Sequence, residues 1–182
     1  IIAGNSFGGT VGYVMKQVAP VLDSEGVTPP EVADMVRDFH DQTMLNTRVK
    51  NTVGHVSLSF SEQDKAKLTD KTMTEIAREY MQKMGIVDTP YIIVRHYDKE
   101  HPHCHIIFSR IDNNGNTISD KNDRLRSVKA CRAITEKYGL YLKLTDAKQN
   151  VKRERLRGPD KVKYEIHDAI KAGLRHCTSW GA

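Results

Sequence analysis

The sequence predicts an α+β fold in which helices pack on one face of a mostly antiparallel sheet. Three observations lead to this prediction: short alternating or apolar runs typical of strands, longer runs with helical spacing between them, and tight turns that join neighbouring elements. A chain of 182 residues is long enough to bury a core. We therefore expect one domain over residues 1–145, with a basic segment and a helix in residues 146–182 belonging to it.

The first third of the chain is predicted to hold a strand end, a turn and two helices. Ile1 and Ile2 end a short strand, a glycine-broken turn spans residues 4–9, and a short helix follows through residues 11–15. After the Pro29-Pro30 pair, apolar residues recur at helical spacing behind Glu31. They are Val32, Met35, Val36 and Phe39.

Three strands and a helix are predicted in the middle of the chain. Residues 53–60 alternate, which places Val56, Leu58 and Phe60 on one face and the polar residues, including His55, on the other. Ser61 is expected to cap a helix whose apolar positions run from Met73 to Met84 before Gly85. Two further strands are expected at residues 91–96 and 103–111.

The last third begins with a turn and ends with a helix. Asn114-Gly115 is a strong turn signal before a short returning strand at residues 117–119. Residues 122–138 are predicted to be helical, and residues 148–157 form a basic, loose segment. Gly158 and Pro159 precede the final helix. The expected buried positions of the helix at 122–138 are Leu125, Val128, Cys131 and Ile134.

The composition narrows the class of protein without fixing it. The net charge of +5 and the pI of about 9.1 permit a polyanionic partner but do not require one. Three widely spaced cysteines argue against a disulfide framework and for a reducing compartment, so we expect a bacterial cytoplasmic location. No apolar run is long enough to cross a membrane. Because the chain begins at Ile1 without a methionine, we expect it to be a fragment of a larger protein.

A cluster of histidines is the strongest chemical feature. Four of the eight histidines lie between residues 96 and 105. Because side chains alternate along a strand, His103 and His105 share one face, and Cys104 turns toward the core. If the strands at 91–96 and 103–111 form a hairpin, His96 joins the pair. Three imidazoles suit a borderline divalent metal and leave positions open for water or a phosphate oxygen.

Three other polar residues are candidates for roles near the cluster. Asp98 can orient a histidine from outside the ligand set. His101 fits an exposed loop position as well as a site position. His55 could line the same cleft, although a structural role is the favoured interpretation.

The string from His96 to Arg110, HYDKEHPHCHIIFSR, closely resembles the three-histidine motif of the HUH superfamily. It is most similar to the relaxases, or mobilization nucleases (MobA/VirD2-like), of conjugative and mobilizable elements. The segments 55–60, 91–96 and 112–120 also resemble that family. The resemblance implies a metal-dependent nuclease that nicks single-stranded origin-of-transfer DNA, with His96, His103 and His105 as metal ligands.

The resemblance also implies the reaction and its partners. A tyrosine near the amino terminus becomes joined to the 5′ phosphate, and this position matches Tyr13. Magnesium or manganese is the expected functional metal, while zinc, nickel or cobalt could occupy the site. Some relatives use a further ligand, so Asp98, Glu100 and His101 stay open as extra ligands. Accessory mobilization proteins and a conjugative coupling protein are the expected protein partners.

DNA contacts and rival functions complete the prediction. Basic residues near the site or in the following helix are candidates for phosphate contacts. They are Arg95, Arg110, Arg124, Arg126 and Lys129. A replication initiator of the same superfamily is the nearest enzymatic alternative. A zinc-stabilised DNA-binding module would need a fourth protein ligand, and His96-Tyr97-Asp98 alone matches half the ligand set of a non-haem iron oxygenase.

Overall fold

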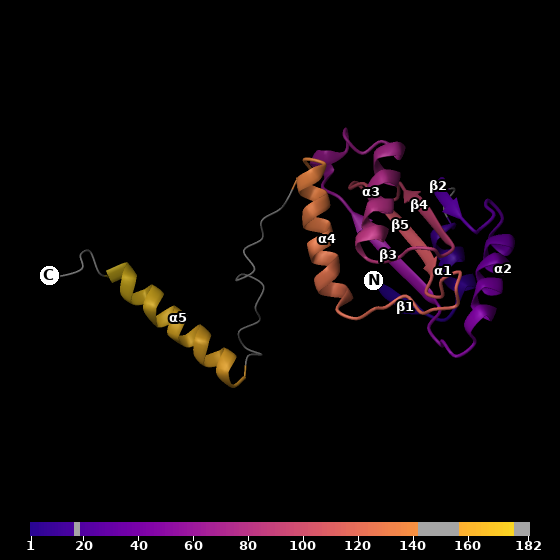
Figure 1. Cartoon of the computed structure of the whole chain (residues 1–182). Helices are drawn as coiled ribbons and strands as arrows, with labels where there is room; N and C mark the ends of the chain where they lie inside the picture. The colour runs from indigo at the N-terminus through magenta and orange to yellow at the C-terminus, as the bar shows by residue number, and fades with distance from the viewer. Residues whose placement is uncertain (17–18, 142–156, 177–182) are drawn as a thin grey trace. The chain divides into compact units, whose positions relative to one another are not determined.

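A five-stranded antiparallel sheet in the order β1-β3-β5-β4-β2 forms the centre of the fold (Figure 1). The computed structural model describes residues 1–16, 19–141 and 157–176. The strands are β1 (Ile2–Gly4), β2 (Val21–Glu25), β3 (Val53–Ser59), β4 (Tyr91–His96) and β5 (His103–Ser109). The helices are α1 (Phe7–Val14), α2 (Val32–Thr43), α3 (Asp70–Lys83), α4 (Asp123–Lys137) and α5 (Pro159–His176), with short 3₁₀ turns at Met44–Asn46 and Glu62–Asp64. The predicted α+β class is confirmed.

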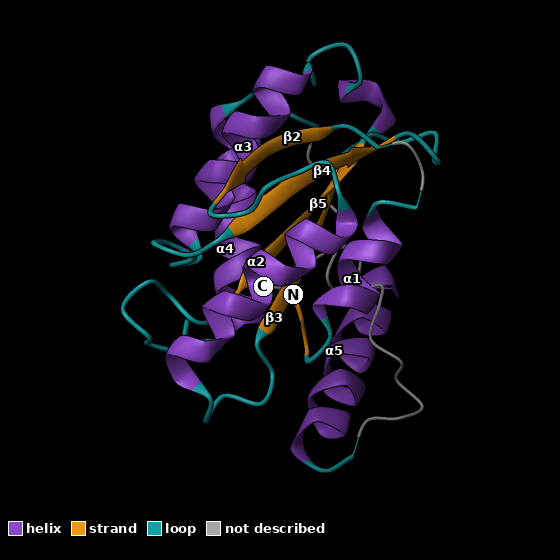
Figure 2. Ribbon diagram, turned by 90° about the vertical axis from the view of Figure 1, so that its right-hand side faces the viewer, coloured by secondary structure: helices purple, strands orange, loops and turns teal. Residues whose placement is uncertain are grey.

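Helices cover both faces of the sheet, not one as the sequence predicted (Figure 2). Leu58, Ile106 and Phe108 pack with α3 and α4 in one apolar cluster. Ile92 and Ile107 point to the opposite face and pack with α1 and α2 in a second cluster. The correction follows from the central strands, which are apolar on both sides and therefore need a layer on each.

Several predicted elements differ in their ends. Helix α1 begins at Phe7, inside the predicted turn, because the Ser6 hydroxyl accepts a hydrogen bond from the Gly9 amide. Ser61 caps only the 3₁₀ turn at Glu62–Asp64, whereas Thr69 caps α3. The returning strand is reduced to one bridge between Ile111 and Thr117.

Strand β2 was not predicted, and contacts remote in sequence hold it in place. Its pairing with β4 shifts register between Val21 and Asp23. The Asp23 carboxylate accepts two hydrogen bonds from Arg78, at 2.6 and 2.7 Å, and one from the Tyr91 hydroxyl at 2.8 Å. Arg78 and Tyr91 together keep the pKa of Asp23 below its usual value. Tertiary bonds therefore stabilise a strand whose own sequence is largely polar.

Helix α4 presents a different face to the core than the sequence predicted. Ile134 is buried as expected, but Leu125 is 65% exposed, Val128 is 46% exposed and Cys131 is also exposed, while Ala130 is buried. The orientation follows from Arg126, whose guanidinium donates to the carbonyls of residues 84, 119 and 121. These bonds turn the Arg126 side of the helix toward the end of α3.

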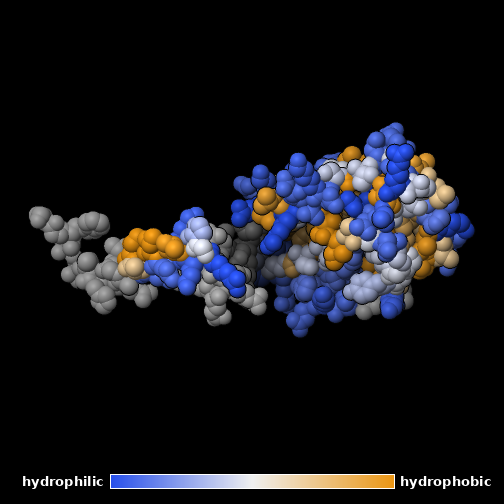
Figure 3. Space-filling model, turned by 90° about the horizontal axis from the view of Figure 1, so that it is seen from below, coloured by the Kyte–Doolittle hydropathy of each residue, from blue (hydrophilic) through white to orange (hydrophobic). Residues whose placement is uncertain are grey.

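The chain divides into two compact units, Ile1–Leu142 and Lys143–Ala182. The second contains the predicted final helix, α5, whose exposed Val162, Ile166 and Ile170 form an apolar stripe (Figure 3). The predicted basic segment 148–157 lies outside the described residues except for its last position. Whether residues 146–182 belong to the first domain stays a prediction. Among the described helices, none combines the length and apolar character that crossing a bilayer requires.

Candidate active site

Strands β4 and β5 bring three imidazoles together on the sheet face that α1 and α2 cover. His96 pairs directly with His103, and His105 lies opposite Val94 in the same hairpin. The three side chains are buried, with at most 7% exposure. Within the described residues they form a group whose potential ligand atoms all lie within 4.8 Å of one another. The convergence expected from the spacing is therefore present, and it can hold a metal ion.

Backbone oxygens outside the group select which nitrogens face inward. His96 Nε2 lies 2.7 Å from the carbonyl oxygen of Val14, and His103 Nδ1 lies 3.3 Å from that of His101. A carbonyl oxygen only accepts, so the facing nitrogen carries the hydrogen of a neutral ring. His96 Nδ1 and His103 Nε2 are then left with lone pairs for a metal.

The surroundings of His105 and His103 lower the pKa of both rings and so favour the neutral, metal-binding form. Burial, followed by the neighbouring His96, His55 and His103, lowers the pKa of His105 to about 4. Burial also lowers the pKa of His103. A site of neutral imidazoles loses no protons when it binds a divalent metal at neutral pH.

Asp98 lies on the inner side of the imidazole group. Its Oδ1 is 3.1 Å from His103 Nε2 and 3.9 Å from His96 Nδ1. Both nitrogens of His103 thus face oxygen acceptors, but a neutral ring has only one hydrogen to donate. A cation between His103 Nε2 and the Asp98 carboxylate would satisfy both groups. The three imidazoles, with Asp98 beside them, therefore fit a metal ion.

The other two candidate ligands are not members of the group. His101 is half-buried, and its ring centre lies 5.5 Å from that of His103, but it is not among the residues whose ligand atoms converge within 4.8 Å. Its carbonyl, not its ring, makes the hydrogen bond to His103. Glu100 is exposed in the loop between β4 and β5.

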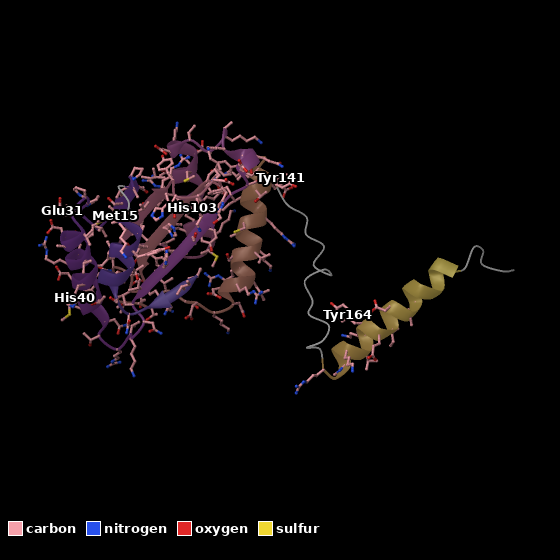
Figure 4. All side chains as sticks on the ribbon, turned by 180° about the vertical axis from the view of Figure 1, so that it is seen from behind. Met15, Glu31, His40, His103, Tyr141 and Tyr164 are labelled. Carbon is pink, nitrogen blue, oxygen red and sulfur yellow. The ribbon has the colours of Figure 1, made fainter. Side chains whose placement is uncertain are left out.

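Tyr13 lies beside the imidazoles although it is far from them in sequence. Helix α1 buries Phe7, Val11 and Val14 against the sheet, and Tyr13 projects away with 58% exposure. Its ring and the His105 ring are nearly perpendicular, with 6.3 Å between ring centres. Figure 4 labels His103 within the sheet and Met15 at the end of α1. The bond from His96 to Val14 anchors this end of the helix.

The remaining tyrosines are less suitably placed. Tyr97 is 63% exposed next to the group, and the Arg95 guanidinium lies 5.0 Å from its ring centre. Tyr80 and Tyr91 are buried and bonded to Ser127 and Asp23. Within the described residues, Tyr13 is the tyrosine whose ring contacts a member of the imidazole group.

The five cations expected to contact DNA separate into two sets. Arg95 pairs with Asp70 at 2.7 Å, and Arg110 pairs with Asp120 at 2.8 Å and donates to backbone carbonyls. Arg126 donates to the Met84 carbonyl at the end of α3 and to the carbonyls of residues 119 and 121 before α4. Arg124 and Lys129 are exposed, and neither side chain has a bonded partner within the described part of the chain.

His55 is expected from the sequence to have a structural role, with a place in the same cleft as the alternative. Its Nε2 lies 2.9 Å from His105 Nδ1, and the two ring centres are 5.1 Å apart. Burial lowers the pKa of His55, which favours the neutral ring. The alternation along β3 did place His55 on the polar face, and the sheet order that sets this face beside His105 was the missing information.

Comparison with known proteins points to one family. The family model described as "Relaxase: MobA/VirD2-like, nuclease domain" matches residues 13–140, which include Tyr13 and the whole histidine string. A search among curated proteins found no match. The family match favours a nuclease over the oxygenase and the zinc-stabilised module considered from the sequence.

Proposed function

The chain belongs to the MobA/VirD2-like relaxases, a family of DNA-nicking nucleases, and we propose that Tyr13 is the nucleophile of its nick. The observation that carries this proposal is the edge contact between the exposed Tyr13 ring and His105. A phosphate held over the imidazole group would lie within reach of the phenol. The substrate in this proposal is one strand of DNA at an origin of transfer.

The reaction is a transesterification. The Tyr13 oxygen forms a bond to phosphorus as the bond from phosphorus to the 3′ oxygen breaks. The phenol loses its proton and the leaving 3′ oxygen gains one, so the products are a 5′ phosphotyrosine and a free 3′ hydroxyl. The linkage conserves the energy of the phosphodiester bond for later rejoining.

His96, His103 and His105 would hold the divalent metal, and the Asp98 carboxylate lies beside them, 3.1 Å from His103 Nε2. When bound, magnesium or manganese supplies positive charge that offsets charge developing on the phosphate oxygens. The chain itself fixes the rings through the Val14 and His101 carbonyls and places Tyr13 through α1. A phenol has a pKa of about 10 and is a weak nucleophile at neutral pH, so this placement matters.

Two exposed cations of α4, which covers the sheet face opposite the imidazole group, stay candidates for contacts with the DNA backbone. Arg124 and Lys129 are free to meet phosphates, whereas Arg95, Arg110 and Arg126 are bonded within the fold. A surface hollow of about 400 Å³ lies at α4, lined in part by Lys121, Arg126 and Lys129. Charge complementarity of this kind supports sequence-independent binding that weakens with salt. A bacterial cytoplasmic location, accessory mobilization proteins and a coupling protein also stay predictions.

The nucleophile can be tested by mapping the covalent adduct. Protein with manganese is incubated with a library of single-stranded oligonucleotides that tile the origin, and adducted peptides are identified by mass spectrometry. We expect the adduct on Tyr13 and its loss in Tyr13→Phe. Tyr97→Phe is the matched control, because Tyr97 is also exposed beside the histidines. An adduct that persists in Tyr13→Phe would refute Tyr13 as the nucleophile while leaving the nicking activity in place.

A further inference from the structure

His55 stands next to the imidazole group without belonging to it. It comes from β3, whereas the three histidines of the group come from the β4–β5 hairpin. In the β3–β5 pairing His55 lies opposite Ile107, and two pairs along, on the same face, Ser57 lies opposite His105. Diagonal neighbours on one face of a sheet are within reach of long side chains. The two rings meet at 2.9 Å between His55 Nε2 and His105 Nδ1.

Either His55 Nε2 or His105 Nδ1 can carry the hydrogen of this bond, and the two cases have opposite consequences for metal binding by His105. If His55 Nε2 donates, His105 Nδ1 accepts, and a neutral His105 must carry its hydrogen on Nε2. That nitrogen then has no lone pair for a metal. If His55 Nε2 accepts, His105 Nδ1 carries the hydrogen and Nε2 is free to bind. Metal binding through the inner nitrogen of His105 therefore requires His55 to act as the acceptor.

We propose that His55 is a positioning residue that accepts a hydrogen bond from His105 Nδ1 and thereby holds His105 in its metal-binding tautomer. The inference rests on the proposed metal site. It gives each ring of the group an outer acceptor: Val14 for His96, His101 for His103 and His55 for His105. The first two acceptors are backbone oxygens and cannot be changed by substitution. The third is a side chain, so it is the one that mutation can address.

Two substitutions of His55 by neutral amide side chains distinguish a role as hydrogen-bond acceptor from a role in packing alone. A glutamine at position 55 places an amide oxygen near the position of the imidazole Nε2. An asparagine is one carbon shorter and ends near the position of Nδ1, out of reach of His105. His55→Gln should therefore preserve the tautomer, whereas His55→Asn should lose it. Both variants remove the imidazole without adding charge.

The experiment has two readouts besides activity. Manganese affinity of the full chain is measured by isothermal titration calorimetry, and the protonated nitrogen of His105 is identified in the metal-free protein by long-range ¹H–¹⁵N NMR. Loss of an outer acceptor typically weakens metal binding about 10-fold to 100-fold. We expect this loss of manganese affinity in His55→Asn and near wild-type affinity in His55→Gln. In the NMR measurement, we expect the wild type and His55→Gln to carry the hydrogen on Nδ1 of His105, and His55→Asn not to. Circular dichroism melts establish that both variants fold.

The outcomes separate this inference from the proposed function. Equal affinity in the two variants, whether strong or weak, would overturn the acceptor role while leaving the metal site intact. A hydrogen on Nε2 of His105 in the wild type would overturn it as well. A third outcome is possible. If none of the proteins bound metal, but the wild type and His55→Gln carried the hydrogen on Nδ1 of His105 and His55→Asn did not, the proposed metal site would fail and the hydrogen-bond assignment would stand.

Discussion

Acid should destabilise the metal-free protein because His105 is buried in its neutral form. The pKa of His105 is lowered from 6.5 to about 4 in the folded chain. Between these values the unfolded state binds the proton and the folded state does not, so stability is full above pH 6.5 and falls as the pH approaches 4. At about 1.4 kcal/mol per pKa unit, lowering the pH from 7.5 to 4.5 should cost about 2–3 kcal/mol through this ring.

Urea unfolding of the chelator-treated protein, followed by circular dichroism at several pH values, measures this cost. His105→Gln is the control, because it removes the titrating ring and keeps a neutral polar side chain. Carboxylates and the other histidines titrate in both proteins, so the difference between the two pH profiles isolates His105. We expect the wild type to lose about 2–3 kcal/mol more than the variant over this interval. Parallel profiles would refute the reasoning.

Two further predictions concern the sheet and α4. Gly54→Ala should destabilise the fold by about 1–3 kcal/mol, because an added Cβ would come closer than 3.0 Å to the buried Phe108 ring. Urea unfolding measures this loss of stability. Unchanged stability would mean that the Phe108 ring moves freely. Arg126→Ala should cost about 1–3 kcal/mol through its lost carbonyl bonds. Lys129→Ala should instead leave stability within about 0.5 kcal/mol and lower the salt dependence of DNA binding. The reverse pattern would show that the roles of Arg126 and Lys129 are exchanged.

The elements that the sequence predicted well are those whose stabilising contacts are local or periodic. Strand β4 was predicted to its end residues, because an apolar run stands between a proline and the histidine loop. Strand β2 was missed, since Asp23 depends on Arg78 and Tyr91. The predicted buried face of α4 was wrong, because the spacing of apolar residues gives no sign that Arg126 bonds to the Met84 carbonyl at the end of α3.

The same distinction applies to the candidate site. The three imidazoles were predicted from spacing alone, because one hairpin carries all of them. Tyr13 came only from family resemblance, since nothing in the sequence near it indicates a neighbour on β5. The contact of His55 with His105 depends on β3 being the neighbour of β5, which is a property of the sheet order.

The placement of all three imidazoles on one hairpin also has a consequence for folding. Closing the short loop between β4 and β5 costs little chain entropy, whereas placing Tyr13 beside His105 requires contacts between distant parts of the chain. We expect an incompletely folded chain to capture metal before its nucleophile is in place. Metal content is thus a poor measure of correctly assembled protein, and covalent capture of a DNA strand is the stricter one.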